Sequence, residues 1–174
     1  MPAPSSLNLC RELATDPTVI REVEMATFGW LHEAALVEAL QAAAALMLSG
    51  VAEVDGIIVG RIAFGPVTIE GKRASFGATA LAPMAVRPDW QRKGVGSALI
   101  RWSLDECRRD RQELVLVLGH LDYYPRFVFV PAMPLDVRCQ FEVPSEAFTL
   151  LELRPGALVG RTESLRYRTE SASV

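Results

Sequence analysis

A short, uninterrupted apolar run places the strongest constraint on the fold of this chain. The run is Leu114–Leu118, and its length and composition are typical of a strand buried on both faces of a sheet. A helical pattern from about Gly94 to Arg109 precedes it, and a strand from about Ala78 to Val86 precedes that helix. Strand, helix and buried strand in this order predict a parallel strand pair with a right-handed crossover.

The first part of the chain predicts one strand and two helices. Alternating apolar residues over Leu7–Leu13 predict a short strand. Asp16-Pro17 has the pattern of a helix start, with an aspartate cap and a proline in the first turn, and this helix is expected to end near Gly29. Apolar residues at helical spacing predict a second helix from about Glu33 to Leu48, closed by Ser49-Gly50.

A β-hairpin is expected around Asp55-Gly56. These residues separate the runs Val51–Val54 and Ile57–Val59. Asp-Gly favours a two-residue turn because both turn positions need a positive φ. The outgoing strand is expected to extend to Ile69, with a bulge or a break at Gly65-Pro66.

The remaining elements complete an α+β domain. Pro83 lies within the strand Ala78–Val86 and indicates either an edge strand or a point where that strand parts from its neighbour, because proline donates no ladder hydrogen bond. A short helix after Tyr123 and strands near Val137–Phe141 and Phe148–Leu153 follow. Without repeats or long linkers, residues 1–174 are predicted to form a single domain around a mixed central sheet.

Composition excludes several classes of function. The chain is 50% hydrophobic, which argues against intrinsic disorder, and its net charge of −3 argues against nonspecific nucleic-acid binding. Ala42–Leu48, the most apolar stretch, is far shorter than the roughly 20 residues of a membrane span. No secretory signal is recognised, so a cytoplasmic location is expected. Cys10, Cys107 and Cys139 form no CxxC pair, so reduced thiols and no metal site are expected.

The loop Gln91–Gly96 carries the clearest chemical signal. It places Arg92, Lys93 and two glycines at the mouth of a helix, where unpaired N–H groups and a partial positive charge favour anions. A nucleotide-hydrolysing P-loop would end in Gly-Lys-Ser/Thr, and a dinucleotide fingerprint would have a third glycine. Taken alone, the loop therefore indicates either a diphosphate cradle or a plain helix start.

The same loop resembles a known family signature. Gln91–Gly96 is similar to the acetyl-CoA motif Q/R-x-x-G-x-G/A of the GNAT superfamily of N-acetyltransferases, and the order of predicted elements matches that fold. Leu118–Phe129 resembles the Tyr-Tyr-Pro-Arg-Phe-Gly-Phe segment of one acetyltransferase branch. Val143–Phe148 and Leu153–Leu158 also resemble that branch, so the similarity extends over nearly the whole chain.

The resemblance implies a binding site for acetyl-CoA as cosubstrate. In the family, the strand before the loop splays from its parallel neighbour, and the pantetheine arm enters the wedge. Pro83 fits the bulge that opens this wedge, and Met84 and Val86 would offer backbone groups to the arm. The residues expected to hold the diphosphate, mostly through main-chain N–H groups, are Gln91, Arg92, Lys93, Gly94, Gly96 and Ser97.

The resemblance also implies catalytic residues. Tyr124 matches the family tyrosine that lies near the CoA sulfur and protonates the departing thiolate. Many relatives keep a glutamate base on the strand, but Ala78–Val86 contains none, so His120 is the first candidate base. Asp122 and Glu33 are alternatives, and Trp30 and His32 lie where either an acceptor pocket or core packing is expected. Val128 replaces the family glycine before Phe129, which changes the expected turn.

Three kinds of function follow from this reading. The first is an enzyme that acetylates an amine of a small molecule or a peptide. The second is an acyl-CoA-binding module without catalysis, which the absent strand glutamate favours. The third is an interaction scaffold that binds no CoA. Relatives often form dimers, so a homodimer is also expected.

Overall fold

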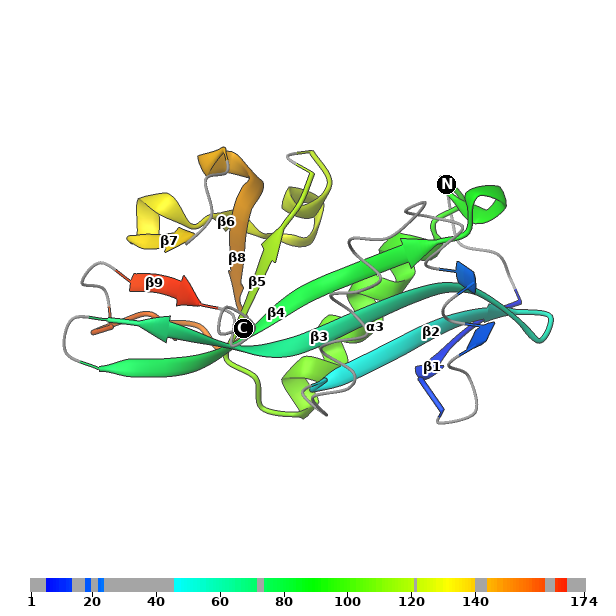
Figure 1. The fold of residues 1–174 in the computed structure, drawn as a ribbon, viewed down its shortest axis with the longest axis horizontal. Coiled ribbons are helices and arrows are strands. Elements are labelled where there is room, and N and C mark those ends of the chain that lie inside the picture. The colour runs from blue at the N-terminus through cyan, green and yellow to red at the C-terminus, as the bar shows by residue number, and fades with distance from the viewer. Residues whose placement is uncertain are drawn as a thin grey trace. The chain divides into compact units, whose positions relative to one another are not determined.

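The structure is a computed structural model that describes residues 6–13, 18–19, 22–23, 46–71, 74–120, 122–139, 144–161 and 165–168 (Figure 1). The main elements are β1 (Leu7–Arg11), β2 (Leu48–Val54), β3 (Ile57–Glu70), β4 (Ser75–Val86), α3 (Val95–Arg109), β5 (Leu114–Leu118), β6 (Val130–Pro131), β7 (Val137–Cys139), β8 (Phe148–Glu152) and β9 (Leu165–Arg168). Four 3-10 helices connect them: η1 (Pro88–Trp90), η2 (Tyr124–Phe127), η3 (Met133–Leu135) and η4 (Ser145–Ala147).

The strands form one mixed sheet, as predicted for an α+β chain. Hydrogen bonds join them in the order β1-β2-β3-β4-β5-β8-β6, and β9 pairs with β3 and β7. β4 and β5 are parallel, which confirms the predicted crossover through α3. Within the described part of the chain, this ladder joins Thr79–Leu81 to Val115–Val117, whereas β4 continues to Val86. The ladder therefore ends two residues before Pro83.

The chain divides into two compact units. Unit 1 comprises Met1–Phe64 and Ala82–Glu106, and unit 2 comprises Gly65–Leu81 and Cys107–Val174. β3, β4 and α3 each contribute residues to both units. A single domain over residues 1–174 stays a prediction.

In unit 1, α3 packs closely on β2 and β3 (Figure 1). A Cβ atom on Gly60 of β3 would lie 3.0 Å from Leu99 Cδ1 and 3.3 Å from Val95 Cγ1, both on α3. A Cβ atom on Gly50 of β2 would overlap the Trp102 ring. The two glycines therefore let the helix approach the sheet, and this close packing fixes the amino-terminal end of α3.

Unit 1 also contains a fully buried arginine. The side chain of Arg61 on β3 is 1% exposed, and its Nε and Nη2 atoms each lie 3.1 Å from Glu12 Oε2. Ser49 donates a hydrogen bond to the same carboxylate oxygen. A buried charge is tolerated only when it is paired, so Glu12 and Arg61 tie the segment after β1 to the centre of the sheet.

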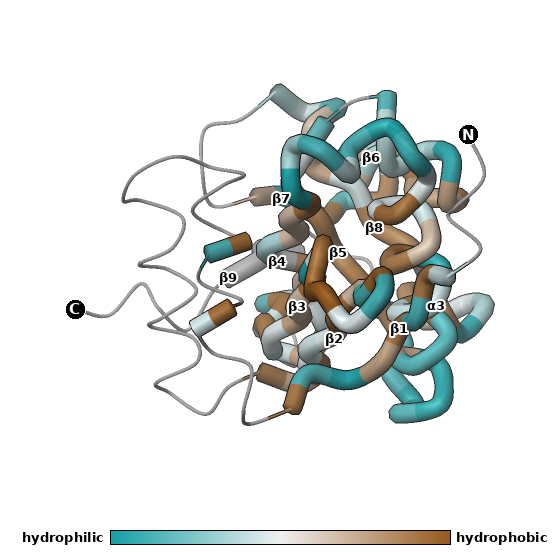
Figure 2. The backbone as a smooth tube through the Cα atoms, turned by 90° about the vertical axis from the view of Figure 1, so that its right-hand side faces the viewer, coloured by the Kyte–Doolittle hydropathy of each residue, from teal (hydrophilic) through white to brown (hydrophobic). Residues whose placement is uncertain are grey.

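Unit 2 has its own apolar core around β5 and β8. Figure 2 draws β5 in the hydrophobic colour along most of its length. Leu114 and Leu116 of β5 pair with Glu152 and Leu150 of β8. The other members of this core cluster come from β3, β4, β7, β8 and the connecting segments, and they include Val67, Ile69, Ala78, Ala80, Ala132, Val137, Phe148 and Leu158.

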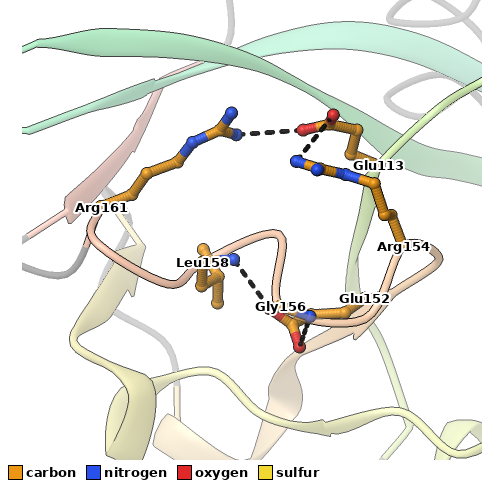
Figure 3. A network of polar contacts seen from close by, with 6 residues as sticks. All are labelled: Glu113, Glu152, Arg154, Gly156, Leu158 and Arg161. Atoms are coloured by element: carbon orange, nitrogen blue, oxygen red, sulfur yellow. Dashed lines mark hydrogen bonds and ion pairs between the residues drawn. The ribbon is translucent and has the colours of Figure 1, made fainter.

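Glutamates at the ends of β5 and β8 fasten the segment after β8 (Figure 3). Glu113 forms ion pairs with Arg154 at 2.8 Å and with Arg161 at 3.1 Å. The Glu152 carboxylate accepts hydrogen bonds from the N–H groups of Leu158 at 2.8 Å and Gly156 at 3.4 Å. These contacts hold the segment Leu153–Leu158 in a turn, in which Gly156 has φ 78.

Most of the strands, helices and turns that were predicted from short sequence patterns are confirmed. The hairpin turn at Asp55-Gly56 has φ values of 50 and 79, both positive as the turn type requires. β5 has the predicted bounds Leu114–Leu118, although Leu118 at its carboxyl end is 47% exposed. β4 begins at Ser75, three residues before the predicted start. Cys107 is buried in α3, as its helical position indicated.

Two predictions are wrong. The helix from Glu33 was expected to reach Leu48 and to close at Ser49-Gly50, but these residues begin β2. Leu48 pairs with Phe64, and Gly50 pairs with Arg11 and Ile62, so hydrogen bonds to distant strands override the local helical pattern. Of the two alternatives expected at Gly65-Pro66, a bulge or a break, the break is also wrong, because β3 continues to Glu70.

The other predictions for this region lie largely outside the described residues. Of the helix expected from Asp16 to Gly29, only residues 18–19 and 22–23 are described, and they are helical. Among the described residues, no helix combines the length and the apolar character that a membrane crossing requires.

Candidate active site

The loop between β4 and α3 has an unusual backbone conformation. Arg92 has φ 58 and Gly94 has φ 78, so two residues of the turn Gln91–Gly94 lie in the left-handed region. Glycine adopts this region freely, whereas other residues incur about 1–2 kcal/mol of strain. Left-handed residues within a turn point successive N–H groups into a concave surface that suits an anion.

Side chains and main chain fix this loop in place. Gln91 donates its Nε2–H to the Val86 carbonyl at 2.9 Å and its backbone N–H to the Pro88 carbonyl at 3.2 Å. The Lys93 ammonium lies 5.1 Å from the centroid of the Trp90 ring, at cation–π distance. Gln91 therefore anchors the loop to the end of β4, while the exposed Arg92 and Lys93 contribute positive charge.

The first turn of α3 adds further donors. The Gly94 carbonyl accepts a hydrogen bond from the Ala98 N–H at 2.9 Å, which is the first bond of the helix. The N–H groups of Val95, Gly96 and Ser97 come before that bond and have no acceptor within the helix. α3 has 15 residues, so its dipole also contributes partial positive charge at this end. Loop and helix together present a donor-rich, positive surface for a phosphate group.

The end of β4 aligns its main chain with this surface. The Arg87 N–H donates to the Val59 carbonyl of β3 at 2.9 Å. Because backbone groups alternate along a strand, those of Val86 and Met84 point to the opposite edge of β4. The Gln91 side chain meets that same edge at the Val86 carbonyl. Met84, Val86 and the loop therefore share one edge of unit 1.

In unit 2, Tyr124 lies in a tight aromatic cluster after β5. Its ring is 7% exposed, and its centroid lies 5.5 Å from that of Tyr123 and 5.7 Å from that of Phe129. A Cβ atom on Gly119 would overlap the Tyr124 ring, so the ring lies directly against the main chain at the end of β5. Tyr124 is the first residue of η2, and Val128, the residue that caps the end of η2, has φ 69.

Burial changes the acidity of this phenol. It raises the pKa of Tyr124 to about 12 from an ordinary value near 10, and the neighbouring Tyr123 adds to the rise. At neutral pH Tyr124 therefore keeps its proton and is a hydrogen-bond donor.

A surface pocket of about 530 Å³ lies beside Tyr124 in unit 2. Its lining residues are Gly119, His120, Asp122, Tyr123 and Arg126. His120, Asp122 and Arg126 are exposed, so the pocket combines a cation, an anion and an imidazole. These groups provide both proton-transfer and charge-recognition chemistry.

Comparisons with known proteins connect these features to one family. Residues 35–131 match the sequence profile of the Acetyltransferase (GNAT) domain. The chain belongs to the GNAT family of acetyltransferases. Escherichia coli strain K12 contains two similar proteins, the uncharacterized N-acetyltransferases YjhQ and YhbS. YjhQ is 42% identical over 119 residues, covering 67% of this chain and 66% of its own length. YhbS is 32% identical over 136 residues, covering 78% and 80%.

Solved structures show the same GNAT fold. E. coli YhbS in complex with CoA superposes with a TM-score of 0.85 at 29% identity, covering 95% of this chain and 92% of its own. A GNAT acetyltransferase from Brucella melitensis in complex with acetyl-CoA gives a TM-score of 0.70 at 35% identity, covering 86% and 89%. The predicted GNAT fold and enzyme class are thereby confirmed.

The predicted site residues of this GNAT domain fall into two groups. Unit 1 brings together Met84, Val86, Gln91, Arg92, Lys93, Gly94, Gly96 and Ser97. Unit 2 holds Tyr124, whose ring packs on Gly119, and His120, which lines the pocket together with Gly119. Trp30, His32 and Glu33 lie outside the described residues. The assignments of these residues, a cytoplasmic location and a homodimer stay predictions.

Sequence reasoning missed three contributors to the unit 2 site. Gly119 makes room for the Tyr124 ring, and Tyr123 and Arg126 line the pocket. For Gly119, the available signal was a glycine between the buried strand and the Tyr-Tyr-Pro segment. No local pattern indicates the other two, because their roles depend on how the chain folds back after β5.

Proposed function

We propose that this GNAT domain transfers an acetyl group from acetyl-CoA to an amine of a small molecule or a peptide. The observation that carries the proposal is the loop Gln91–Gly94, whose left-handed Arg92 and Gly94 open a 15-residue helix with donor-rich first-turn N–H groups. Such a surface fits the diphosphate of CoA. The complexes of the similar GNAT structures with CoA and acetyl-CoA support the same donor.

Donor binding would rest mainly on main-chain groups. The N–H groups of Gly94, Gly96 and Ser97 would hold the diphosphate, while Arg92 and Lys93 would add charge attraction. Gln91 would act by holding the loop, because its side chain and its N–H already bond to Val86 and Pro88. The edge groups of Met84 and Val86 would align the pantetheine arm as an added strand-like partner.

The proposed reaction balances without another reactant. The neutral amine attacks the thioester carbonyl carbon, a C–N bond forms, and the C–S bond breaks. The amine nitrogen loses one proton and the departing sulfur gains one, so the products are an N-acetyl amide and CoA thiol. A lysine-like amine has a pKa of about 10.4, so it must lose a proton before it attacks. His120, exposed at the pocket after β5, is the proposed base for that proton.

Tyr124 is proposed to stabilise the departing sulfur. Its pKa of about 12 lies above the roughly 8.5 of an ordinary thiol, so complete proton transfer to a thiolate is uphill by about 5 kcal/mol. A hydrogen bond from the phenol to the developing thiolate avoids this penalty and still lowers the barrier. The proton that the sulfur finally takes up then comes from the amine, through His120 or water.

A thiol-release assay over a panel of primary amines tests the proposal. We expect the wild-type chain to release CoA thiol with at least one acceptor. Gly94→Glu places a carboxylate at the proposed diphosphate site and a side chain at a positive φ, so it should abolish CoA binding and turnover. Gly77→Glu is the matched control, because nothing lies within 4 Å of a Cβ atom there.

Calorimetry with CoA separates the remaining outcomes. Full activity in Gly94→Glu would remove the loop from the mechanism. CoA binding without turnover by any acceptor would favour the non-catalytic acyl-CoA-binding module. No CoA binding at all would leave only a scaffold and would overturn the proposal.

A further inference from the structure

The pocket beside Tyr124 contains an arginine that is held in a fixed position. Arg126 donates its Nε–H to the Asp122 carbonyl at 3.2 Å, and its Cζ atom lies 5.3 Å from the centroid of the Tyr123 ring. Both partners also line the pocket. Stacking and the hydrogen bond restrain the flexible side chain, so little conformational entropy is lost when its terminal nitrogens bind a ligand.

Within the part of the chain that the structure describes, no carboxylate forms an ion pair with Arg126. Arg11, Arg61, Arg154 and Arg161 each form an ion pair with a glutamate. Among the described residues, no such ion pair involves Arg126. The hydrogen bond that Arg126 makes to a described residue uses Nε, which leaves Nη1 and Nη2 as the atoms available to a ligand at the pocket that Arg126 lines.

We propose that Arg126 forms an oxyanion subsite, which binds a carboxylate or a phosphate group of a substrate. The planar fork of a guanidinium matches the two oxygens of either group with parallel hydrogen bonds. Asp122 and His120 share the pocket, and the Asp122 carboxylate opposes a highly charged anion. The Asp122 carboxylate therefore favours a ligand in which the oxyanion lies next to a positive group, such as the ammonium of an amino acid. This inference rests on the proposed acetyl transfer.

Two substrates contain the required chemistry. The acceptor would supply a carboxylate close to its amine, and the donor would supply the 3′-phosphate of CoA. Matched pairs of substrates distinguish them. L-amino acids and their amides differ in the acceptor carboxylate, and acetyl-CoA and acetyl-dephospho-CoA differ in the 3′-phosphate.

The experiment compares kcat/KM for these pairs in the wild type, Arg126→Gln and Arg126→Lys. If the acceptor carboxylate binds, Arg126→Gln should lower kcat/KM about 10–100-fold for amino acids and leave it unchanged for their amides. If the 3′-phosphate binds, Arg126→Gln should lower kcat/KM for every acceptor when acetyl-CoA is the donor. With acetyl-dephospho-CoA as the donor, kcat/KM should be unchanged. Arg126→Lys keeps the charge without the fork and should show an intermediate loss.

Arg138→Gln is the matched control, because Arg138 is an exposed arginine of unit 2 on β7, outside the pocket. Equal kinetics of Arg126→Gln and Arg138→Gln on all four substrate types would overturn the oxyanion subsite. A cooperative thermal transition in each variant shows that folding is retained, and Arg126→Lys keeps the comparison available if Arg126→Gln fails to fold.

A binding measurement decides the case in which no acceptor reacts at all, which would contradict the proposed function. Sodium acetate and sodium phosphate are titrated against sodium chloride at constant ionic strength, with the backbone N–H groups of Gly119, His120, Asp122 and Tyr123, which the variants retain, followed by NMR. Saturable shifts in the wild type that are absent in Arg126→Gln would support the subsite. No anion-specific shift would refute it.

Discussion

The Tyr124 ring packs directly on the main chain of Gly119. A Cβ atom at Gly119 would overlap Cε2 of the ring and would lie 3.2 Å from Cδ2 and 3.3 Å from Cζ. The ring has no room to retreat, because Tyr123 and Phe129 surround it and it is 7% exposed. The absence of a side chain at the end of β5 therefore positions the tyrosine of the candidate site.

Gly119→Ala should destabilise the chain and lower its activity together. Overpacking of this kind typically costs about 1–3 kcal/mol. Urea unfolding gives the change in stability, and the thiol-release assay gives kcat. Gly77→Ala is the control, since a Cβ atom at that position meets nothing within 4 Å. If Gly119→Ala unfolds at the same urea concentration as Gly77→Ala and keeps full kcat, the close packing has no consequence.

Val128→Gly should stabilise the chain. Val128 has φ 69, which strains a β-branched residue by about 1–2 kcal/mol, and its side chain is 73% exposed, so little burial is lost. Glycine loses about 0.5–1 kcal/mol more conformational entropy on folding. The expected net gain is therefore up to about 1.5 kcal/mol in urea unfolding.

Val159→Gly provides the contrast. Val159 is 81% exposed but is not among the positive-φ residues, so glycine there brings only the entropic penalty. A Val128→Gly variant that loses as much stability as Val159→Gly would show that the left-handed turn stores no strain.

Tyr124→Phe tests the role of the phenol in two ways. If the phenol donates a hydrogen bond to the departing sulfur, its loss should lower kcat about 10–100-fold, the equivalent of one hydrogen bond to a charged group. The raised pKa also predicts a stability effect, because the folded state holds this proton more tightly than the unfolded state. That contribution is complete below pH 10 and is lost as the pH rises from 10 to about 12.

Ultraviolet difference titration of the wild type against Tyr124→Phe isolates one phenol among the three tyrosines of the chain. The difference should show a midpoint near pH 12. A midpoint near 10 would mean that the ring is accessible to water. An unchanged kcat would remove Tyr124 from the reaction.

The predictions that succeeded rest on patterns complete within a few residues. Asp55-Gly56 specifies its turn by itself, and Leu114–Leu118 is apolar without interruption, so neither depends on a distant partner. Leu48–Gly50 was misassigned because its strand exists only through pairing with β1 and β3. β9 was missed for the same reason, since its partners β3 and β7 lie far away in the sequence.

The same difference between local patterns and contacts with distant segments decides which parts of the candidate site could be predicted. Glycine spacing before α3 predicted the candidate anion-binding loop, because a positive φ at Gly94 and first-turn N–H groups without an acceptor in the helix are local properties. Val128 keeps the turn despite lacking the family glycine, at the cost of a left-handed backbone. The pocket of Arg126 was not predictable, because it arises from stacking on Tyr123 after the chain folds back from β5.

Glu113 should make the stability of the chain sensitive to acid. The hydrogen bond from Arg154 is the largest cause that lowers the pKa of this carboxyl, and Arg161 acts in the same direction (Figure 3). A lowered pKa in the folded state means that the unfolded state binds the proton more readily. The stabilisation is therefore complete above the ordinary pKa of 4.5 and is lost as the pH falls below it.

Glu113→Gln should therefore unfold at a lower urea concentration than the wild type at pH 7, and the difference should shrink as the pH falls from 5 to 3. Glu146→Gln is the control, because Glu146 is an exposed glutamate of unit 2 in η4, away from the Glu113 ion pairs. Arg161→Ala should lose more than Glu113→Gln, since Arg161 also lies 4.7 Å from the Phe76 ring centroid. A difference between wild type and Glu113→Gln that stays constant from pH 7 to 3 would show that the ion pairs add no pH-dependent stability.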